Sequence, residues 1–150
     1  MIRILVAGLF AAVLSCPAFS PIAHAAPAQV VAITLQDVSV DLSISGMTIK
    51  TDPAKVKAGR VTLEAVNQSK NLVHEVLVIP DPPAGREPPY DTKTDTVIEK
   101  RVHSLGEISE LKPGARGKLT LTLKPGTYLL LCNQPGHYKS GMSTKLVVEK

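Results

Sequence analysis

The residues best suited to chemistry lie in one short segment near the C-terminus. Residues 132–142 read CNQPGHYKSGM and contain Cys132, His137 and Met142. Two imidazoles, one thiolate and a weak axial thioether form the ligand set of a copper electron-transfer site. The segment supplies three of those four groups, so such a site requires a second histidine from elsewhere in the chain.

His74 is the candidate for that second histidine. It lies near the start of the apolar run Leu72–Ile79, directly after the turn-forming residues 67–71. A single histidine at a strand end is usually only a partly exposed residue, and a cysteine followed by a histidine five positions later is common by chance. The joint occurrence of all four residues is far rarer and favours a metal site. His103 and Met47 have no such partners. We expect His103 to be a surface residue and Met47 to be a core residue.

Alternating or continuous apolar patterns predict β-strands along most of the chain. No segment shows sustained helical periodicity, and turn-forming residues recur about every ten positions, as in β-sandwiches. We therefore expect an all-β fold, a Greek-key β-sandwich of seven or eight strands. Because its loops gather at two ends, His74 can lie beside residues 132–142. The predicted strands are Val30–Leu35, Val38–Ser45 with a continuation at Met47–Lys50, Val61–Ala65, Leu72–Ile79, Leu119–Leu123, Thr127–Cys132 and Leu146–Val148.

Three segments are not predicted to be core strands. Thr51–Gly59 has a proline, a glycine and several lysines, and we expect a surface connection. Pro80–Tyr90 has five prolines, which excludes it from a sheet interior. Thr92–Ser109 has the least regular pattern, and within it Val97–Val102 is a candidate edge strand or short helix.

The N-terminal residues predict export. One basic residue, an apolar run too short to span a bilayer and the small-residue pattern Ala23-His24-Ala25 are typical of a secretory signal peptide. We expect a signal peptide at residues 1–25, one domain at residues 26–150, and a periplasmic location. An alternative interpretation is a lipid anchor at Cys16, although Leu14 before Ser15 fits a lipoprotein signal poorly.

The expected exported domain contains a single cysteine, Cys132. Exported domains normally use cysteines in pairs, so a lone one requires a reason. A metal-bound thiolate is one reason; a buried inert thiol and an intermolecular disulfide are the alternatives. The formal charge is +4, or +3 without Arg3. The lysines are scattered along the chain, and aromatic residues are few. This excludes a typical nucleic-acid surface and is compatible with docking to another protein.

The two candidate segments resemble those of the cupredoxins, the blue (type 1) copper proteins. The loop CNQPGHYKSGM is similar to the copper loop of that family, and NLVHEVLV resembles its upstream histidine strand. The spacing is most like that in rusticyanin and auracyanin. In azurin, which shares the Cys-x-x-Pro-Gly-His portion, the methionine comes one residue sooner.

The resemblance implies one type 1 copper ion, with His74, Cys132 and His137 as equatorial ligands and Met142 as the axial ligand. It also implies that His137 is the exposed edge for electron transfer, within an apolar patch that includes Pro135 and Gly136 and to which Pro80–Tyr90 can contribute. Two residues depart from the family pattern. Glu75 follows the first histidine, where many members have an asparagine that ties the two ligand segments together. Asn133 follows the cysteine, where serine or threonine is usual.

These features predict a monomeric one-electron carrier rather than an enzyme. The resemblance implies c-type cytochromes, copper oxidases or copper reductases as redox partners. The alternative function is periplasmic copper binding and delivery, although the sequence lacks the Met- or His-rich tracts of many such proteins. A nucleophilic enzyme using Cys132 and His137 lacks any visible third orienting residue.

Overall fold

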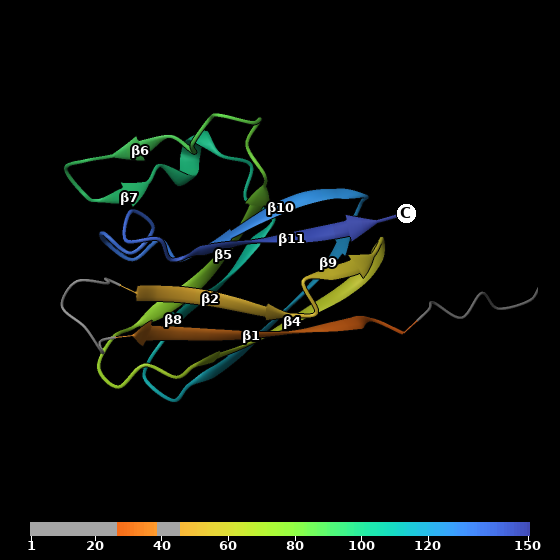
Figure 1. Ribbon diagram of the computed structural model, residues 1–150, viewed down its shortest axis with the longest axis horizontal. Coiled ribbons are helices and arrows are strands. Elements are labelled where there is room, and N and C mark those ends of the chain that lie inside the picture. Colours follow the sequence, from red (N-terminus) through yellow and green to blue (C-terminus); the bar gives the residue numbers. More distant parts are fainter. Residues whose placement is uncertain (1–26, 39–45) are drawn as a thin grey trace, which may run out of the picture.

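The computed structural model describes residues 27–38 and 46–150. The expected signal peptide, Cys16 and residues 39–45 of one predicted strand lie outside the described residues. Two sheets pack face to face, and a smaller layer lies on the outer side of one of them (Figure 1). Among the described helices, none is long and apolar enough to cross a membrane.

The first sheet has four strands and the second has five, which confirms the predicted all-β sandwich. The two sheets together contain nine strands in the described chain, against the seven or eight expected. The first sheet has the order β2 (Gly46–Asp52), β1 (Gln29–Val38), β4 (Gly59–Asn67) and β9 (Arg116–Leu123). The second has the order β3 (Lys55–Lys57), β11 (Ser143–Glu149), β10 (Gly126–Leu131), β5 (His74–Pro80) and β8 (Gly106–Leu111).

The sandwich core follows from the period-two alternation of its strands. In β1, Val31, Ile33 and Leu35 are fully buried, while residues between them are more exposed. Val76 and Val78 of β5 face the same interior from the second sheet. Burying each such side chain contributes about 1.5–3 kcal/mol, so this row fixes which face of each strand points inward.

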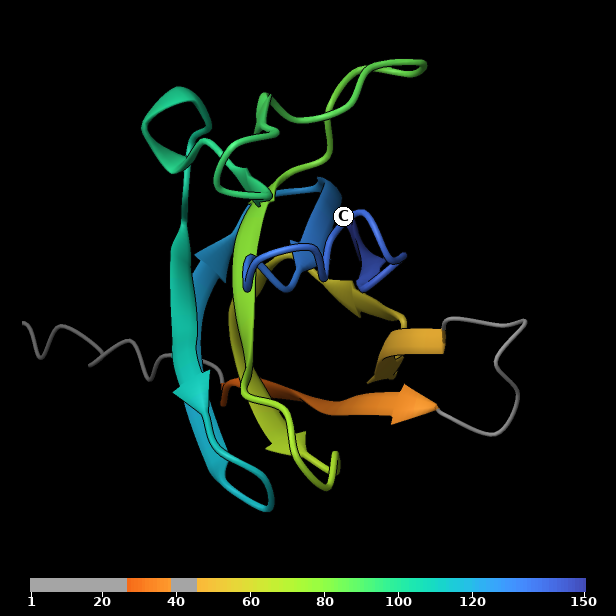
Figure 2. The same ribbon diagram turned by 90° about the vertical axis from the view of Figure 1, so that its left-hand side faces the viewer.

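A separate layer covers the outer face of the second sheet. We call residues 81–105, between β5 and β8, the excursion; Figure 2 shows it in green above the sandwich. It contains β6 (Tyr90–Asp91), β7 (Thr96–Val97) and the short 3-10 helix η1 (Glu99–Arg101). It forms a second apolar cluster with the sheet. That cluster is built from Leu77, Ile79, Val97, Leu129 and Leu131, with Tyr90, Val102 and Tyr138 packed against it.

Several local predictions are refined by the structure. Val30–Leu35 and Val38 belong to one continuous strand, β1, because its pairing with β4 up to Leu35 overlaps its pairing with β2 from Ala32 to Val38. Thr51–Gly59 is not only a connection: β3 lies within it and pairs in parallel with the end of β11. Thr92–Ser109 contains the start of β8, which the sequence did not predict. Val97–Val102 is neither one strand nor one helix, since β7 ends at Val97 and η1 follows.

Candidate metal centre

Neighbouring strands bring the predicted site residues together. β5 and β10 pair antiparallel, with Leu77 opposite Leu131. The start of β5, His74, therefore lies beside the residues that follow β10, beginning with Cys132. The loop from Cys132 to Met142, which we call the copper loop, connects β10 to β11.

Three ligand-type atoms converge at this point. His74 Nδ1 and His137 Nδ1 are 3.2 Å apart. Cys132 Sγ lies 3.3 Å from His137 Nδ1 and 3.8 Å from His74 Nδ1. A point equidistant from atoms at these separations is about 2.0 Å from each, close to metal–imidazole and metal–thiolate bond lengths of roughly 2.0–2.3 Å. The triangle therefore fits a single metal ion.

Both histidines are held in the neutral form that binds metals. His74 is fully buried, and this burial, together with the nearby His137, lowers its pKa to about 4 against a weak opposing effect of Asp37. Burial also lowers the pKa of His137, which is partly exposed. Neutral imidazole is the ligand form, so neither nitrogen has to lose a proton near neutral pH before it binds a metal.

Cys132 is fully buried between the sheets. Burial raises the pKa of its thiol to about 11, partly offset by hydrogen bonds from the Gln134 and Glu75 amides. The Glu75 N–H lies 3.5 Å from Sγ. Because a bound cation deprotonates a coordinating thiol outright, this buried sulfur is suited to a metal and poorly suited to act as a free thiolate.

Met142 completes the copper loop and is fully buried. Its N–H donates to the His137 carbonyl, and the Cys132 N–H donates to the Met142 carbonyl, each at 3.0 Å. The coiled path between them uses left-handed backbone at Gly136 and Gly141, with φ of 78° and 88°. Such conformations are readily adopted by glycine. The main chain thus links the three predicted ligand residues of the loop directly.

Glu75, the first departure from the family pattern, ties the two ligand segments together. Its Oε1 accepts the Asn133 N–H at 3.1 Å, and its Oε2 accepts Gln134 Nε2–H at 2.9 Å. The side chain is almost fully buried, and burial raises the pKa of its carboxyl group. The cross-link that the resemblance assigns to asparagine is made here by a carboxylate.

Asn67 supports the His74 side of the site and was not identified from the sequence. It is fully buried, and its Nδ2 donates to the carbonyls of Leu72 and Leu111 at 2.8 and 2.7 Å. Its Oδ1 accepts the Ser69 N–H at 2.9 Å. The sequence marks residues 67–71 as turn formers, and the asparagine that precedes a candidate ligand strand is the one local signal for Asn67.

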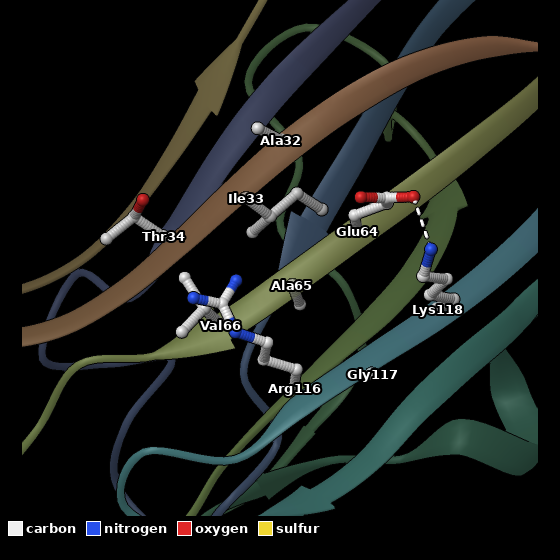
Figure 3. Close-up of a pocket in the computed structure, with 9 residues that line it drawn as sticks. All are labelled: Ala32, Ile33, Thr34, Glu64, Ala65, Val66, Arg116, Gly117 and Lys118. Carbon is white, nitrogen blue, oxygen red and sulfur yellow. Dashed lines mark hydrogen bonds and ion pairs between the residues drawn. The ribbon is translucent and has the colours of Figure 1, made fainter.

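His103 is not part of the group of converging ligand-type residues. His103 is exposed, and Met47 packs against the main core. A shallow groove on the outer face of the first sheet is crossed by a Glu64–Lys118 ion pair at 2.7 Å (Figure 3). Neither the two histidines nor Cys132 line it.

Comparison with known proteins defines the class. Residues 36–149 match the family described as copper binding proteins, plastocyanin/azurin family. The chain belongs to this family, and its cofactor is one type 1 copper ion. No curated protein matches the sequence.

Solved structures show the same fold. Auracyanin from the photosynthetic bacterium Roseiflexus castenholzii is 21% identical with a TM-score of 0.55, over 83% of this chain and 99% of that one. Rusticyanin from Thiobacillus ferrooxidans is 18% identical with a TM-score of 0.54, over 82% and 79%. Auracyanin B is 22% identical with a TM-score of 0.54, over 87% and 96%. The predicted similarity to rusticyanin and auracyanin is thereby confirmed at the level of fold.

Proposed function

We propose that the chain is an exported one-electron carrier whose copper is held by His74, Cys132 and His137, with Met142 as the axial ligand. The convergence of one sulfur and two neutral imidazole nitrogens in a buried site carries the proposal. When bound, copper would take up and release one electron by changing between Cu(II) and Cu(I). The signal peptide at residues 1–25, the mature domain at residues 26–150 and the periplasmic location belong to this proposal.

The protein residues have distinct roles in this function. Cys132 and His74 hold the ion from within the sandwich and exclude water, since both are fully buried. His137 is partly exposed and provides the edge through which an electron passes to a docked redox protein. Packed strands and the Glu75 cross-link keep the ligand geometry nearly constant between oxidation states, which lowers the reorganisation cost. A catalytic metal needs an open coordination position, whereas the proposed ligands His74 and Cys132 are fully buried, so we propose a carrier rather than an enzyme.

The test is a visible and EPR spectrum of protein produced from the full chain and loaded with Cu(II). We expect an intense thiolate charge-transfer band and reversible reduction. Cys132→Ser is expected to abolish the band and high-affinity binding, whereas the exposed His103→Ala control is expected to keep both. A colourless protein that gives up copper readily to chelators would instead support copper delivery. A spectrum that survives Cys132→Ser would refute the ligand assignment.

A further inference from the structure

Asn133, the second departure from the family pattern, uses its whole side chain to bind the excursion. Its Oδ1 accepts the Val97 N–H at 2.6 Å. Its Nδ2 donates to the Val97 carbonyl at 3.1 Å and to Glu99 Oε1 at 2.8 Å. The residue is only 7% exposed; its two bonds to Val97 are buried, and its bond to Glu99 is partly buried. All three bonds run from the copper loop to the layer outside the sandwich.

A second link lies three residues further along the copper loop. The Gly136 N–H donates to the Asp95 carbonyl at 2.8 Å. Asp95 lies in the turn between β6 and β7, and its φ of 55° is left-handed, a conformation that a residue other than glycine adopts at a cost. Figure 1 shows the copper loop directly beside this turn. Lys139 and Glu87 form a third, exposed contact.

These links flank two of the proposed ligands. Asn133 directly follows Cys132, and Gly136 directly precedes His137. We propose that the excursion is an external clamp on the copper loop, and that Asn133 is the positioning residue through which it holds Cys132 and His137. Only the identity of these two residues as ligands rests on the proposed function; the clamp itself is a property of the chain without metal.

The physical reason is that the copper loop has few strand partners of its own. A loop outside the sheet ladder is free to open locally unless side-chain bonds hold it. The excursion can serve as a fixed support because Val97 is anchored in the second apolar cluster with Leu77 and Leu131. Removing the Asn133 side chain keeps the apolar side chains of that cluster but deletes three of the hydrogen bonds that tie the loop to this support.

Amide hydrogen exchange of the metal-free protein, produced from the full chain, tests the clamp. Asn133→Ala is expected to accelerate exchange about tenfold or more at the Gly136 amide, which makes no bond to residue 133. Asn71→Ala, at an exposed loop asparagine, is the matched control and is expected to change nothing at Gly136. Faster exchange at Val97 alone, with Gly136 unchanged, would overturn the clamp.

Glu99 provides a milder second test that does not depend on Asn133→Ala folding. Glu99→Ala removes one of the three bonds and is expected to accelerate Gly136 exchange about threefold. Glu99→Gln keeps the acceptor oxygen and is expected to rescue the original rate. If Glu99→Ala has no effect on Gly136, the proposal fails.

The copper-loaded protein gives an independent readout of positioning. The Cu(II) EPR hyperfine splitting and the charge-transfer band are expected to shift in Asn133→Ala and to stay unchanged in Asn71→Ala. Unchanged spectra would show that Asn133 does not position the ligands. Failure of the unaltered protein to bind copper would refute the proposed function, while hydrogen exchange would still decide whether the clamp exists.

Discussion

The two segments that carry the candidate ligands are held in different ways. His74 is part of β5, which lies between β10 and β8 and is buried along almost its whole length. The copper loop lies outside the ladder, and its own main-chain bonds, Glu75 and the excursion hold it. One side of the site is therefore fixed by strand pairing and core packing, whereas the other is fixed by particular polar side chains. We expect the strand side to resist local opening. We expect the stability of the loop side to change when a single polar side chain is replaced.

Asn67→Ala is expected to have the largest effect, because Asn67 is the fully buried polar side chain that supports the segment leading into His74. It leaves the buried Leu111 carbonyl and Ser69 N–H without this partner, while the Leu72 carbonyl keeps its hydrogen bond from the Ser69 hydroxyl. At about 1–3 kcal/mol for each unsatisfied group, we expect a loss of about 4 kcal/mol in the free energy of unfolding. Urea denaturation of the metal-free protein measures it, with Asn71→Ala as control. A loss below about 1 kcal/mol would mean that strand packing alone fixes His74.

The pH dependence of stability separates the two histidines. The folded-state pKa of His74 is about 4, below its ordinary value of 6.5. The unfolded chain therefore binds more protons between these values, so stability is complete above pH 6.5 and falls as the pH drops toward 4. We expect His74 to account for a loss of at most about 3 kcal/mol.

Denaturation of the metal-free protein across this range, compared with His74→Gln and His137→Gln, isolates each contribution. Replacing the buried His74 is expected to flatten the profile more than replacing the partly exposed His137. If both replacements flatten the pH profile of stability equally, the expected difference between the strand-held His74 and the loop-held His137 is contradicted.

Glu87→Gln is expected to have the smallest effect. It breaks the outermost link of the loop side, an ion pair with Lys139 in which both side chains are substantially exposed, at 66% and 46%. Exposed pairs contribute little, and Lys139 still lies over the Tyr90 ring at 5.2 Å. We expect a change below about 0.5 kcal/mol in thermal unfolding, shrinking further in high salt. A larger loss of stability that salt does not reduce would show that this contact is an essential part of the clamp.

The sequence predicted the sandwich and the candidate site because both have local signals. Period-two alternation marks the strands, and His74, Cys132, His137 and Met142 are recognisable from residue type and spacing. β8 was missed because only Ile108 and Leu111 of its residues are buried, and its pairing with β5 is interrupted by a bulge. Its pattern is too irregular to read as a strand.

The supporting residues were harder to predict because their partners are distant in the chain. Glu75 can reach Asn133 only in the register in which β5 pairs with β10. Asn133 is understandable only once the excursion folds back over Leu129 and Leu131. Local sequence identifies the ligand candidates, whereas the contacts that hold them arise from the tertiary fold.

The hydrogen bonds from Cys132 to Met142 and from Met142 to His137 join the two ends of the copper loop through its own main chain. They close the segment on itself between the last residue of β10 and the first of β11, so its internal length is independent of the strand registers. We therefore expect a segment of different length between the same two end residues to leave the pairs of β10 and β11 unchanged. The fold thus places three of the four proposed ligands on a segment whose length the strand pairing does not set, and the fourth, His74, on a strand of the sandwich.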